Sequence, residues 1–290
     1  MYAVDFDYYR AGSLADAQKL LGDHPGAKLL AGGHSLIPLM KLRLAAPPAV
    51  VDIGRVAELR GVTLSGAAVR IGALTTHTEL AASADLGRAA PALAETAAQL
   101  GDPTVRNRGT IGGNIAHADP ASDLPTVLVA LDARINVVGP TGPRTIDAAK
   151  FFTGLMTTSL EENEIVTSID VPVAQPGRGS AYVKFSHPAS RYAVIGAAAA
   201  ITLSGGTCSS VSVAIGGLVA HARRLPSVER ALTDQAPSES VVAKAAAAVA
   251  ADLGRDVSGD IFASAEYRTA VAPVYVKRAL LAAAARASAR

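Results

Sequence analysis

The first half of the chain alternates short, β-rich apolar runs with segments whose apolar residues recur at helical spacing. Three runs are typical of short strands: residues 27–31, 49–53 and 69–73. An apolar stripe follows Ser13, which can cap a helix over residues 13–21. A further helix is predicted over residues 89–100, because Gly101 and Pro103 mark its end.

The middle of the chain continues this alternation after one polar, glycine-rich stretch. Residues 102–123 are expected to form a loop that is longer than a plain connection, and long loops inside compact domains are often functional. After it we expect a helix, a strand, a short helix opened by Thr145 and Asp147, and another strand, over residues 124–131, 133–138, 145–152 and 164–171. This alternation indicates a mixed α/β unit.

A linker rich in proline and glycine, residues 174–180, separates this unit from the rest of the chain. Three strand-like runs and then three helical segments follow, over residues 181–185, 193–203, 211–218, 228–232, 238–253 and 267–285. Pro273 marks either the start of the last helix or a kink in it. The order predicts a small α+β domain with a three-stranded antiparallel sheet.

Residues 192–222 contain no Asp, Glu, Lys or Arg, and are long enough for a membrane helix. However, Gly205 and Gly206 interrupt the stretch, and residues 211–215 alternate with a period of two. Two strands joined by a glycine turn fit this pattern better than a spanning helix. We therefore expect no transmembrane segment. The N-terminus carries early acidic residues and no apolar core, so we also expect no signal peptide.

The composition counts against several classes of protein. Half of the 290 residues are hydrophobic and the net charge is only +2, so the chain can bury a core and does not resemble a disordered protein. Aromatic residues are few and no basic stripe stands out, which argues against nucleic-acid binding. The single cysteine, Cys208, is expected to be a packing residue in a reducing compartment, and no metal site is expected.

Several common catalytic and nucleotide-binding motifs are absent. The sequence has no G-x-G-x-x-G, no G-x-x-x-x-G-K-[ST], no H-E-x-x-H and no C-x-x-C. Gly33-His34-Ser35 begins a G-x-S-x-G nucleophile elbow that Ile37 fails to complete. These absences count against NAD dehydrogenases of the usual fold, ATPases, zinc hydrolases and serine esterases.

The first motif with chemical content is Leu-Leu-Ala-Gly-Gly-His-Ser at residues 29–35. Successive backbone N–H groups in a tight turn form a nest that holds phosphate oxygens, and glycine lets an anion approach them closely. Ser35 can add a hydroxyl donor. The alternative is an ordinary Gly-Gly turn, which is the better interpretation of this motif taken alone.

The second motif, Gly-Thr-Ile-Gly-Gly-Asn at residues 109–114, again has paired glycines beside polar residues. Thr110 and Asn114 flank the paired glycines and are good hydrogen-bonding partners. A pyrophosphate carries two negative charges and several acceptor oxygens, so two nests would suit it. Two unrelated turns are the alternative, and the residues alone do not decide between the two interpretations.

Asp119 and Asp123 follow in the segment Ala-Asp-Pro-Ala-Ser-Asp-Leu-Pro at residues 118–125. Carboxylates repel phosphate but bind hydroxyls well, so a ribityl or ribose chain beside a pyrophosphate would suit them. The alternative is that Asp123 caps the following helix and that Asp119 and Pro120 form a turn. Both roles are compatible for Asp123.

Together these segments resemble the FAD-binding medium subunits of molybdenum hydroxylases, and the aerobic carbon monoxide dehydrogenase group is the most similar. Residues 31–44 resemble the first FAD loop of that family, and residues 102–114 with 118–125 resemble the second. Their order, spacing and flanks agree, and the resemblance covers nearly the whole chain. Two long motifs in register are far more specific than a single Gly-Gly pair.

The resemblance implies the α+β fold of the vanillyl-alcohol oxidase (PCMH) type, in the same class as the murein-precursor reductases. FAD would lie extended between two subdomains, at about residues 1–55 and 56–175, of an FAD-binding domain over residues 1–175. A small α+β domain over residues 179–290, of the carbon monoxide dehydrogenase flavoprotein type, would cover the isoalloxazine.

The resemblance also assigns residues to FAD. Backbone amides of two segments would hold the pyrophosphate: Ala31, Gly32, Gly33, His34, Ser35, and Thr110, Ile111, Gly112, Gly113, Asn114. Asp123 would bind the ribityl hydroxyls with Asp119 nearby, and His34 would serve the geometry of its loop.

Four further residues stand where family members contact or approach the flavin ring: Leu100, Val166, Lys184 and Tyr192. Leu100 and Val166 would be core residues in any fold, and Lys184 could be a solvated strand residue. Tyr192 matches a tyrosine that lies against the isoalloxazine. The family has Asp before it where this chain has Arg191, which leaves the local charge open.

The same resemblance implies partner subunits. Substrate would be oxidised at a molybdenum cofactor in a large subunit, and [2Fe–2S] clusters in a small subunit would pass electrons to FAD, because this chain lacks the cysteines that such clusters need. The cofactor carries the chemistry, so no catalytic acid or base is expected here. We expect a dimer of heterotrimers, a heterohexamer, in the cytoplasm, and leave open its association with the inner face of the membrane through an acceptor.

Two other functions compete with an electron-transfer subunit. A self-contained flavin oxidase or dehydrogenase would need a substrate pocket with a base in the C-terminal domain, and the small size of that domain counts mildly against this. A binding or scaffold module that has lost FAD is the other alternative, and the intact glycine pairs with Asp123 count against it. The sequence does not distinguish carbon monoxide, an aldehyde or an N-heteroaromatic ring as the substrate, and it does not identify the final electron acceptor.

Overall fold

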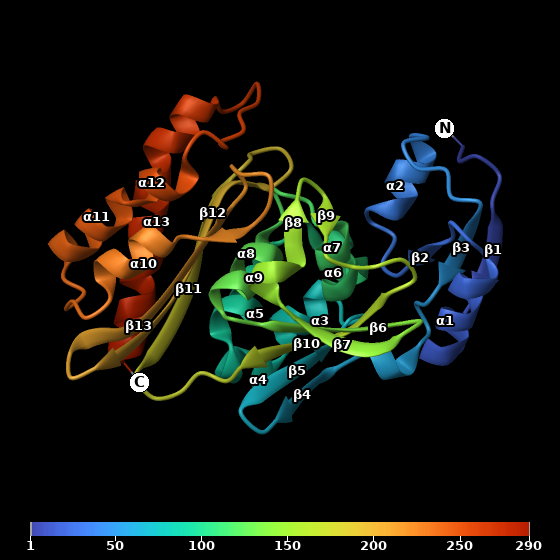
Figure 1. The fold of residues 1–290 in the computed structure, drawn as a ribbon, viewed down its shortest axis with the longest axis horizontal. Coiled ribbons are helices and arrows are strands. Elements are labelled where there is room, and N and C mark those ends of the chain that lie inside the picture. The colour runs from blue at the N-terminus through green and yellow to red at the C-terminus, as the bar shows by residue number, and fades with distance from the viewer. Residues whose placement is uncertain (1, 290) are drawn as a thin grey trace.

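Three main sheets divide the chain into three units that lie in a row, with the N-terminal unit at one end and the C-terminal unit at the other (Figure 1). The structure is a computed structural model that describes residues 2–289. Helices of the middle unit lie between its own sheet and the sheet of the C-terminal unit (Figure 1). The arrangement is α+β, as the sequence predicted.

The N-terminal unit is built on a parallel sheet with the strand order β1-β3-β2. Ser13 accepts a hydrogen bond from the Asp16 amide and caps the first helix, which confirms the predicted cap. Ala17 and Leu21 of that helix pack against Val51 of the central strand. The elements are β1 (Asp7–Arg10), α1 (Leu14–Asp23), β2 (Lys28–Leu30), α2 (Leu36–Lys41) and β3 (Ala49–Asp52).

The middle unit has an antiparallel sheet with the strand order β4-β5-β10-β6-β7, and its core lies between that sheet and a layer of helices. The strands are β4 (Val62–Ser65), β5 (Ala68–Gly72), β6 (Arg134–Gly139), β7 (Gly142–Asp147) and β10 (Ile165–Pro172), and β8 (Phe152–Gly154) pairs with β9 (Thr157–Thr158). The helices are η1 (Ala57–Leu59), α3 (His77–Ala82), α4 (Ala84–Ala89), α5 (Pro91–Gln99), α6 (Pro103–Arg108), α7 (Ile111–His117), α8 (Asp123–Ala130) and α9 (Ala148–Phe151).

The C-terminal unit is an antiparallel sheet, β11-β12-β13-β14, with helices on its outer face. Its elements are β11 (Arg178–Ser186), β12 (Ala193–Ser204), β13 (Thr207–Gly216), β14 (Arg223–Arg224), α10 (Pro226–Leu232), α11 (Glu239–Ala247), α12 (Val249–Leu253) and α13 (Ala265–Ser288). Successive side chains of a strand point to opposite faces of the sheet. Ala197 and Ala199 accordingly join the C-terminal core, whereas Ala198 and Ala200 join the core of the middle unit. Strand β12 is thus shared between two hydrophobic cores.

The uncharged stretch forms the predicted hairpin. Strands β12 and β13 pair in antiparallel register, and Gly205 and Gly206 at the turn have φ values of +58° and +84°. Within residues 2–289, no helix is long and apolar enough to cross a membrane. Cys208 is buried in the C-terminal core, which confirms its expected packing role.

One predicted element of the middle unit is corrected and another is confirmed. The stretch expected to be a loop, residues 102–123, contains helices α6 and α7 because Asp102 and Thr110 each cap a helix with their side chains. The helix expected over residues 89–100 is confirmed as α5, and the shorter helix α4 precedes it. Pro91 separates them because proline fits the first turn of a helix but interrupts one that is already running.

Four further predictions need correction. The short helix expected over residues 145–152 is present as α9 with Asp147 as its N-cap, but it starts later than expected because Thr145 lies in strand β7. The C-terminal sheet has a fourth, two-residue strand, β14, in addition to the three expected strands. The helix expected over residues 238–253 is divided into α11 and α12. Pro273 lies inside α13, which begins at Ala265 with Ser264 as its N-cap, so Pro273 does not start the helix.

Candidate functional site

The two glycine motifs, which lie far apart in the sequence, touch in the fold. A Cβ atom on Gly32 would lie 2.1 Å from the Arg108 carbonyl oxygen and 3.0 Å from the Gly109 Cα atom. No side chain fits there, so the glycine permits direct backbone packing. Gly33 follows with a φ of +80°, a conformation that glycine adopts readily. The structure therefore places both motifs at one site.

The ring of His34 ties the first motif to the segment before the second. Its Nε2 atom lies 3.1 Å from the Thr104 carbonyl oxygen at the start of α6. Ser35 precedes helix α2 without a side-chain capping bond, so the structure does not use its hydroxyl there. These positions agree with a loop-shaping role for His34 and leave the hydroxyl of Ser35 available as a donor.

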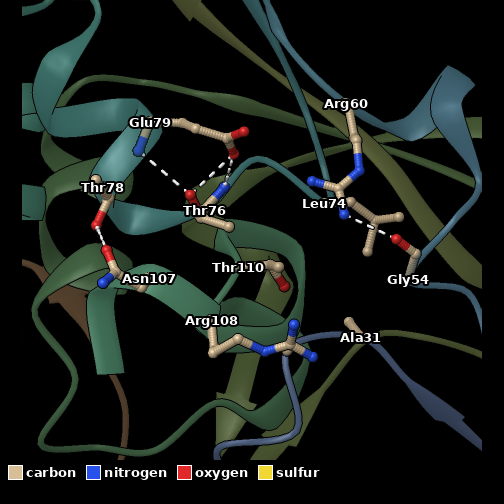
Figure 2. A pocket seen from close by; sticks show the side chains of 11 residues that line it. Ala31, Gly54, Arg60, Leu74, Thr76, Thr78, Glu79, Asn107, Arg108 and Thr110 are labelled. Carbon is tan, nitrogen blue, oxygen red and sulfur yellow. Dashed lines mark hydrogen bonds between the residues drawn. The ribbon is translucent and has the colours of Figure 1, made fainter. Parts of the chain in front are cut away.

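A pocket of about 400 Å³ opens beside the contact between the motifs. This volume falls in the range of roughly 300–1,000 Å³ that is usual for small-molecule sites. Ala31, Gly32 and Thr110 line it, and the side chains of Arg60 and Arg108 reach it from different sides (Figure 2). Its wall thus combines both predicted motifs with two cationic groups.

The backbone amides divide unequally between the two motifs. In the second motif, the Ile111 amide donates to Thr75, the Gly112 amide to Ala73, and the amides of Gly113 and Asn114 to Thr110. In the first motif, the amides of Gly32, Gly33, His34 and Ser35 have no hydrogen-bond acceptor within residues 2–289. The first motif therefore supplies most of the open amides, and the second motif adds only the amide of Thr110, which also has no acceptor within residues 2–289.

This division limits the backbone amides that the second motif can offer to a ligand. The amides of Ile111, Gly112, Gly113 and Asn114 serve the start of helix α7 and do not form an open nest. Thr110 caps that helix through its hydroxyl, and its position in the pocket wall is the direct contribution of the motif. The paired glycines in this segment belong to a helix rather than to a turn.

A second cluster lies where the middle unit meets the C-terminal sheet. The Asp123 carboxylate lies 2.8 Å from the Lys184 ammonium, and both side chains are only 3% exposed. The buried Tyr182 hydroxyl donates to the other oxygen of the same carboxylate. Lys184 also donates to the Gln99 carbonyl at 3.3 Å and to the Arg191 carbonyl at 2.9 Å. Lys184 is therefore a buried anchor and not a solvated strand residue.

Burial controls the ionisation of this cluster. It raises the pKa of Asp123, and the charge and hydrogen bonds of Lys184 and Tyr182 oppose the shift. Burial and the charge of Asp123 raise the pKa of Tyr182 well above its usual value, so Tyr182 stays protonated and donates. A carboxylate can accept about four hydrogen bonds, so these two protein donors do not exhaust Asp123.

Asp119 and Tyr192 lie beside this cluster. Burial raises the pKa of the half-exposed Tyr192, and the negative charges of Asp119 and Asp123 raise it further, so its phenol lies within electrostatic reach of both carboxylates. Asp119 accepts the Ala121 amide at 2.9 Å. The φ of Arg191 is +61°, which turns the chain immediately before Tyr192.

Leu100 and Val166 are buried side chains of one hydrophobic core in the middle unit. Leu100 ends helix α5 next to Gln99, whose carbonyl accepts from Lys184. Val166 lies beside an irregularity in the pairing of β10 with β6. Their burial accounts for their apolar character whether or not they also contact a ligand.

The pocket and the Asp123 cluster are connected through one helix and one turn. Asn114 on α7 accepts a hydrogen bond of 2.8 Å from the Ser122 hydroxyl, directly before Asp123. Thr110 lines the pocket at the other end of the same helix. A ligand that extends from the pocket towards Asp123 would therefore follow α7.

The sequence reasoning missed Arg60, Glu79, Arg108 and Tyr182. Arg108 stands directly before the second motif, but its side-chain direction is visible only in the fold (Figure 2). Tyr182 stands two positions before Lys184 on the same strand, and this period-two spacing could have suggested that both side chains share a face. Nothing in the local sequence of Arg60 indicates that it faces the pocket.

Comparisons with known proteins agree with this arrangement. Residues 4–174 match the family described as FAD binding domain in molybdopterin dehydrogenase, and residues 180–283 match the family described as CO dehydrogenase flavoprotein C-terminal domain. The carbon monoxide dehydrogenase medium chain of Hydrogenophaga pseudoflava is 43% identical over 97% of this chain and 98% of its own. Subunit alpha of the 6-hydroxypseudooxynicotine dehydrogenase complex of Paenarthrobacter nicotinovorans is 39% identical, over 99% of this chain and 97% of its own.

A solved structure shows the same fold. A chain of carbon monoxide dehydrogenase from Hydrogenophaga pseudoflava superposes with a TM-score of 0.94 at 43% identity, over 99% of both chains. The family matches together span most of the chain, and the relatives are covered almost from end to end. The chain therefore belongs to the family of FAD-binding medium subunits of carbon monoxide dehydrogenase-type molybdenum hydroxylases, and it is an oxidoreductase subunit.

Proposed function

We propose that this chain carries FAD as the electron-transfer subunit of a molybdenum-containing hydroxylase, accepting electrons from [2Fe–2S] clusters and passing them to an external acceptor. The observation that carries the proposal is the backbone contact between Gly32 and Arg108, which brings both predicted motifs to one pocket. FAD supplies the capacity to accept electrons singly and release them in pairs. The residues of this chain bind it, orient it and limit its contact with water.

The proposed FAD path begins at the pocket and ends at the junction of the middle unit with the C-terminal sheet. The open amides of Gly32 to Ser35 fit a pyrophosphate, and Asp119 and Asp123 fit the hydroxyls of a ribityl chain. The complete proposed set is Ala31, Gly32, Gly33, His34, Ser35, Leu100, Thr110, Ile111, Gly112, Gly113, Asn114, Asp119, Asp123, Val166, Lys184 and Tyr192.

Lys184 and Tyr192 are proposed to lie nearest the flavin ring. Lys184 is a fixed cation at the junction, held by a carboxylate and two carbonyls. A fixed positive charge favours negative charge on a neighbouring group. Tyr192 is half exposed and can pack a ring face, with Leu100 and Val166 behind the site as apolar support.

The proposed domain division places an FAD-binding domain over residues 1–175, with subdomains of about 1–55 and 56–175, and a C-terminal domain over residues 179–290. Two observations support it. The family matches change between residues 174 and 180, and the connecting segment after Pro172 lies outside both sheets. The parallel sheet of the N-terminal unit and the antiparallel sheet of the middle unit support the subdivision.

The proposed partners are a large subunit with the molybdenum cofactor and a small subunit with two [2Fe–2S] clusters, in a cytoplasmic dimer of heterotrimers. Relatives named as medium chains support the presence of partners. The proposed substrate is carbon monoxide, because the medium chain at 43% identity belongs to a carbon monoxide dehydrogenase. A relative at 39% belongs to a complex named for 6-hydroxypseudooxynicotine, so the substrate would be decided in the large subunit.

An absorption spectrum of the protein, co-expressed with the products of neighbouring genes and purified, tests this proposal. We expect flavin equimolar with this chain, released by acid and identified as FAD by chromatography, together with iron–sulfur absorption from co-purifying subunits. Flavin without partners or iron would instead favour the self-contained oxidase. A purified complex without any flavin would overturn both enzyme functions. It would favour the binding or scaffold module that has lost FAD.

A further inference from the structure

We propose that Arg108, assisted by Arg60, binds the phosphates of the adenylate half of the cofactor and makes this chain select FAD over FMN. This inference rests on the proposed function, because it concerns the same cofactor. It adds two specificity-determining residues that lie outside the predicted amide nests.

The argument begins with the negative charge that a pyrophosphate brings into the pocket. Because the amides of residues 111–114 are already used inside the protein, the open amides of the two motifs within residues 2–289 are those of the first motif and of Thr110. A dianionic group needs more donors than one short loop supplies, and charge-assisted donors bind it best. The side chains of the pocket wall must therefore provide the rest.

Only three charged side chains line the pocket within residues 2–289: Arg60, Glu79 and Arg108. Arg108 forms neither a side-chain hydrogen bond nor an ion pair with any described residue, so all five of its N–H donors are available. An arginine fork matches two phosphate oxygens at once. Arg108 thus has the chemistry and the freedom to bind a phosphate.

The backbone of Arg108 is held where such a contact would be useful. Its carbonyl oxygen packs against Gly32, next to the open amides of the first motif. Its side chain extends from there along the pocket towards Ala31 (Figure 2). A phosphate bound by the Gly32 and Gly33 amides would therefore lie beside this guanidinium.

Arg60 approaches from the opposite wall and is partly fixed. One of its terminal nitrogens donates to the Gly54 carbonyl at 2.8 Å, which leaves its other N–H groups for a ligand (Figure 2). Both arginines are exposed in the structure, so their charges face the solvent-filled pocket and are not committed to the core. Together they frame a site for an extended anionic ligand.

Glu79 indicates which way an adenosine diphosphate group would be oriented in the pocket. Its carboxylate accepts the Thr76 amide at 2.6 Å and the Thr76 hydroxyl at 2.9 Å, so it is fixed as a negative group on one wall (Figure 2). It would repel a phosphate but can accept hydrogen bonds from ribose hydroxyls. We therefore expect the adenosine ribose on the Glu79 side and the phosphates on the Arg108 side.

FMN lacks the adenylate half and cannot use these contacts fully. Removing Arg108 should therefore weaken FAD binding much more than FMN binding, and the effect should shrink at high salt because it is electrostatic. ADP, which carries the adenosine and both phosphates without a flavin, should compete with FAD for the pocket. Its binding should depend on Arg108 in the same way.

The test compares the wild-type complex with Arg108→Gln, Arg60→Gln and the rescue variant Arg108→Lys, each stripped of cofactor. Arg88→Gln is the matched control, because Arg88 is an exposed arginine on α4 that pairs, among the described residues, only with Asp85.

Quenching of flavin fluorescence gives the affinities for FAD and FMN, and calorimetry gives the affinity for ADP. We expect Arg108→Gln to weaken FAD and ADP about tenfold or more and FMN less than about twofold. Arg60→Gln should have a smaller effect in the same direction, and Arg108→Lys should restore part of the loss.

Equal losses for FAD and FMN, or no loss for FAD, would overturn the selective role of Arg108. A wild-type complex that binds no flavin would overturn the proposed function. In that case the ADP titration still tests whether the pocket contains a phosphate-binding site. ADP binding that weakens in Arg108→Gln would then support the phosphate site, and ADP binding that is absent or unchanged would overturn it. An unaltered unfolding midpoint for Arg108→Gln excludes misfolding as the cause of any loss.

Discussion

The pocket beside Gly32 and the junction at Asp123 differ in the exposure of their charged groups. The pocket is lined by Gly32 and Thr110, whose amides are open within residues 2–289, and by the exposed side chains of Arg60 and Arg108. The junction buries its charges, and Lys184 and Tyr182 already hold the Asp123 carboxylate. The pocket is therefore ready to receive a charged ligand, whereas the junction already pairs its buried charges within the protein and leaves Asp123 acceptor capacity only for neutral hydroxyls.

Because of this difference, we expect the charged groups of the pocket to serve ligand binding and those of the junction to serve the stability of the fold. Exposed cations contribute little to the folded state, so changing them should alter ligand affinity and leave the fold intact. Buried paired charges are costly to separate, so changing one of them should destabilise the contact between the middle unit and the C-terminal sheet. The three predictions that follow test this contrast in order of decreasing effect.

Lys184→Met should give the largest loss of stability. The substitution leaves the Asp123 carboxylate buried without its cation, and breaking a buried pair costs about 3–5 kcal/mol. Urea unfolding measures the change. Lys277→Met is the control, because Lys277 pairs with the exposed Glu239 on the surface and its removal should have little effect.

A double variant sharpens this prediction. Asp123→Asn combined with Lys184→Met removes both charges and should recover part of the stability that Lys184→Met loses. If Lys184→Met and Lys277→Met destabilise the protein equally, the contrast between a junction of buried paired charges and an exposed pocket is wrong.

The second prediction concerns His77, which lies beneath the pocket. Its amide donates to the Gly109 carbonyl, and its buried Nδ1 atom has no partner among the described residues. Burial first, and then the positive charges of His34 and Arg106, lower the pKa of His77 to about 4 from its usual 6.5. The folded protein thus resists protonating a group that the unfolded chain protonates readily.

The direction of the pH effect follows from this shift. The contribution of neutral His77 to stability is complete above pH 6.5 and is lost as the pH falls from 6.5 to about 4, which amounts to roughly 3 kcal/mol. His77→Gln should flatten the pH dependence of unfolding in this window, measured against wild type. Parallel curves for the two proteins would show that His77 is not responsible.

The third prediction concerns Gly32→Ala. The added methyl group would overlap the Arg108 carbonyl and separate the two motifs, at a cost of about 1–3 kcal/mol. The flavin content of the purified protein should fall at the same time. Gly87→Ala is the control, because Gly87 lies in helix α4 with open space around it, and alanine there should stabilise the protein by up to about 1 kcal/mol. Gly32→Ala protein with full flavin content and unchanged stability would contradict the close packing.

The sequence predicted the main elements and both glycine motifs because their signals are local. Ser13 next to an apolar stripe predicted α1, and Gly205 with Gly206 predicted the hairpin of β12 and β13. Strand β7 was missed because Ile146 is its one buried residue, so its more buried positions do not form an apolar pattern in the sequence. Helix α7 was missed because its paired glycines are typical of turns and its stability depends on Thr110 and on packing.

The details of the site depend on contacts between distant parts of the chain. The resemblance placed Asp123 and Lys184 in one site, but no local pattern indicates that they form a buried pair with Tyr182. The second motif was predicted to offer amides to a phosphate, but Thr75 and Ala73 accept two of them across the fold. Local sequence indicates which groups are available, whereas tertiary structure decides which remain open.

A structure of the purified complex with its flavin bound tests the central claim most directly. The account predicts FAD phosphates within hydrogen-bonding distance of the Gly32 and Gly33 amides and of the Arg108 guanidinium, with the ribityl chain directed along α7 towards Asp123. FAD phosphates bound elsewhere, or a flavin whose ribityl chain leads away from Asp123, would contradict it.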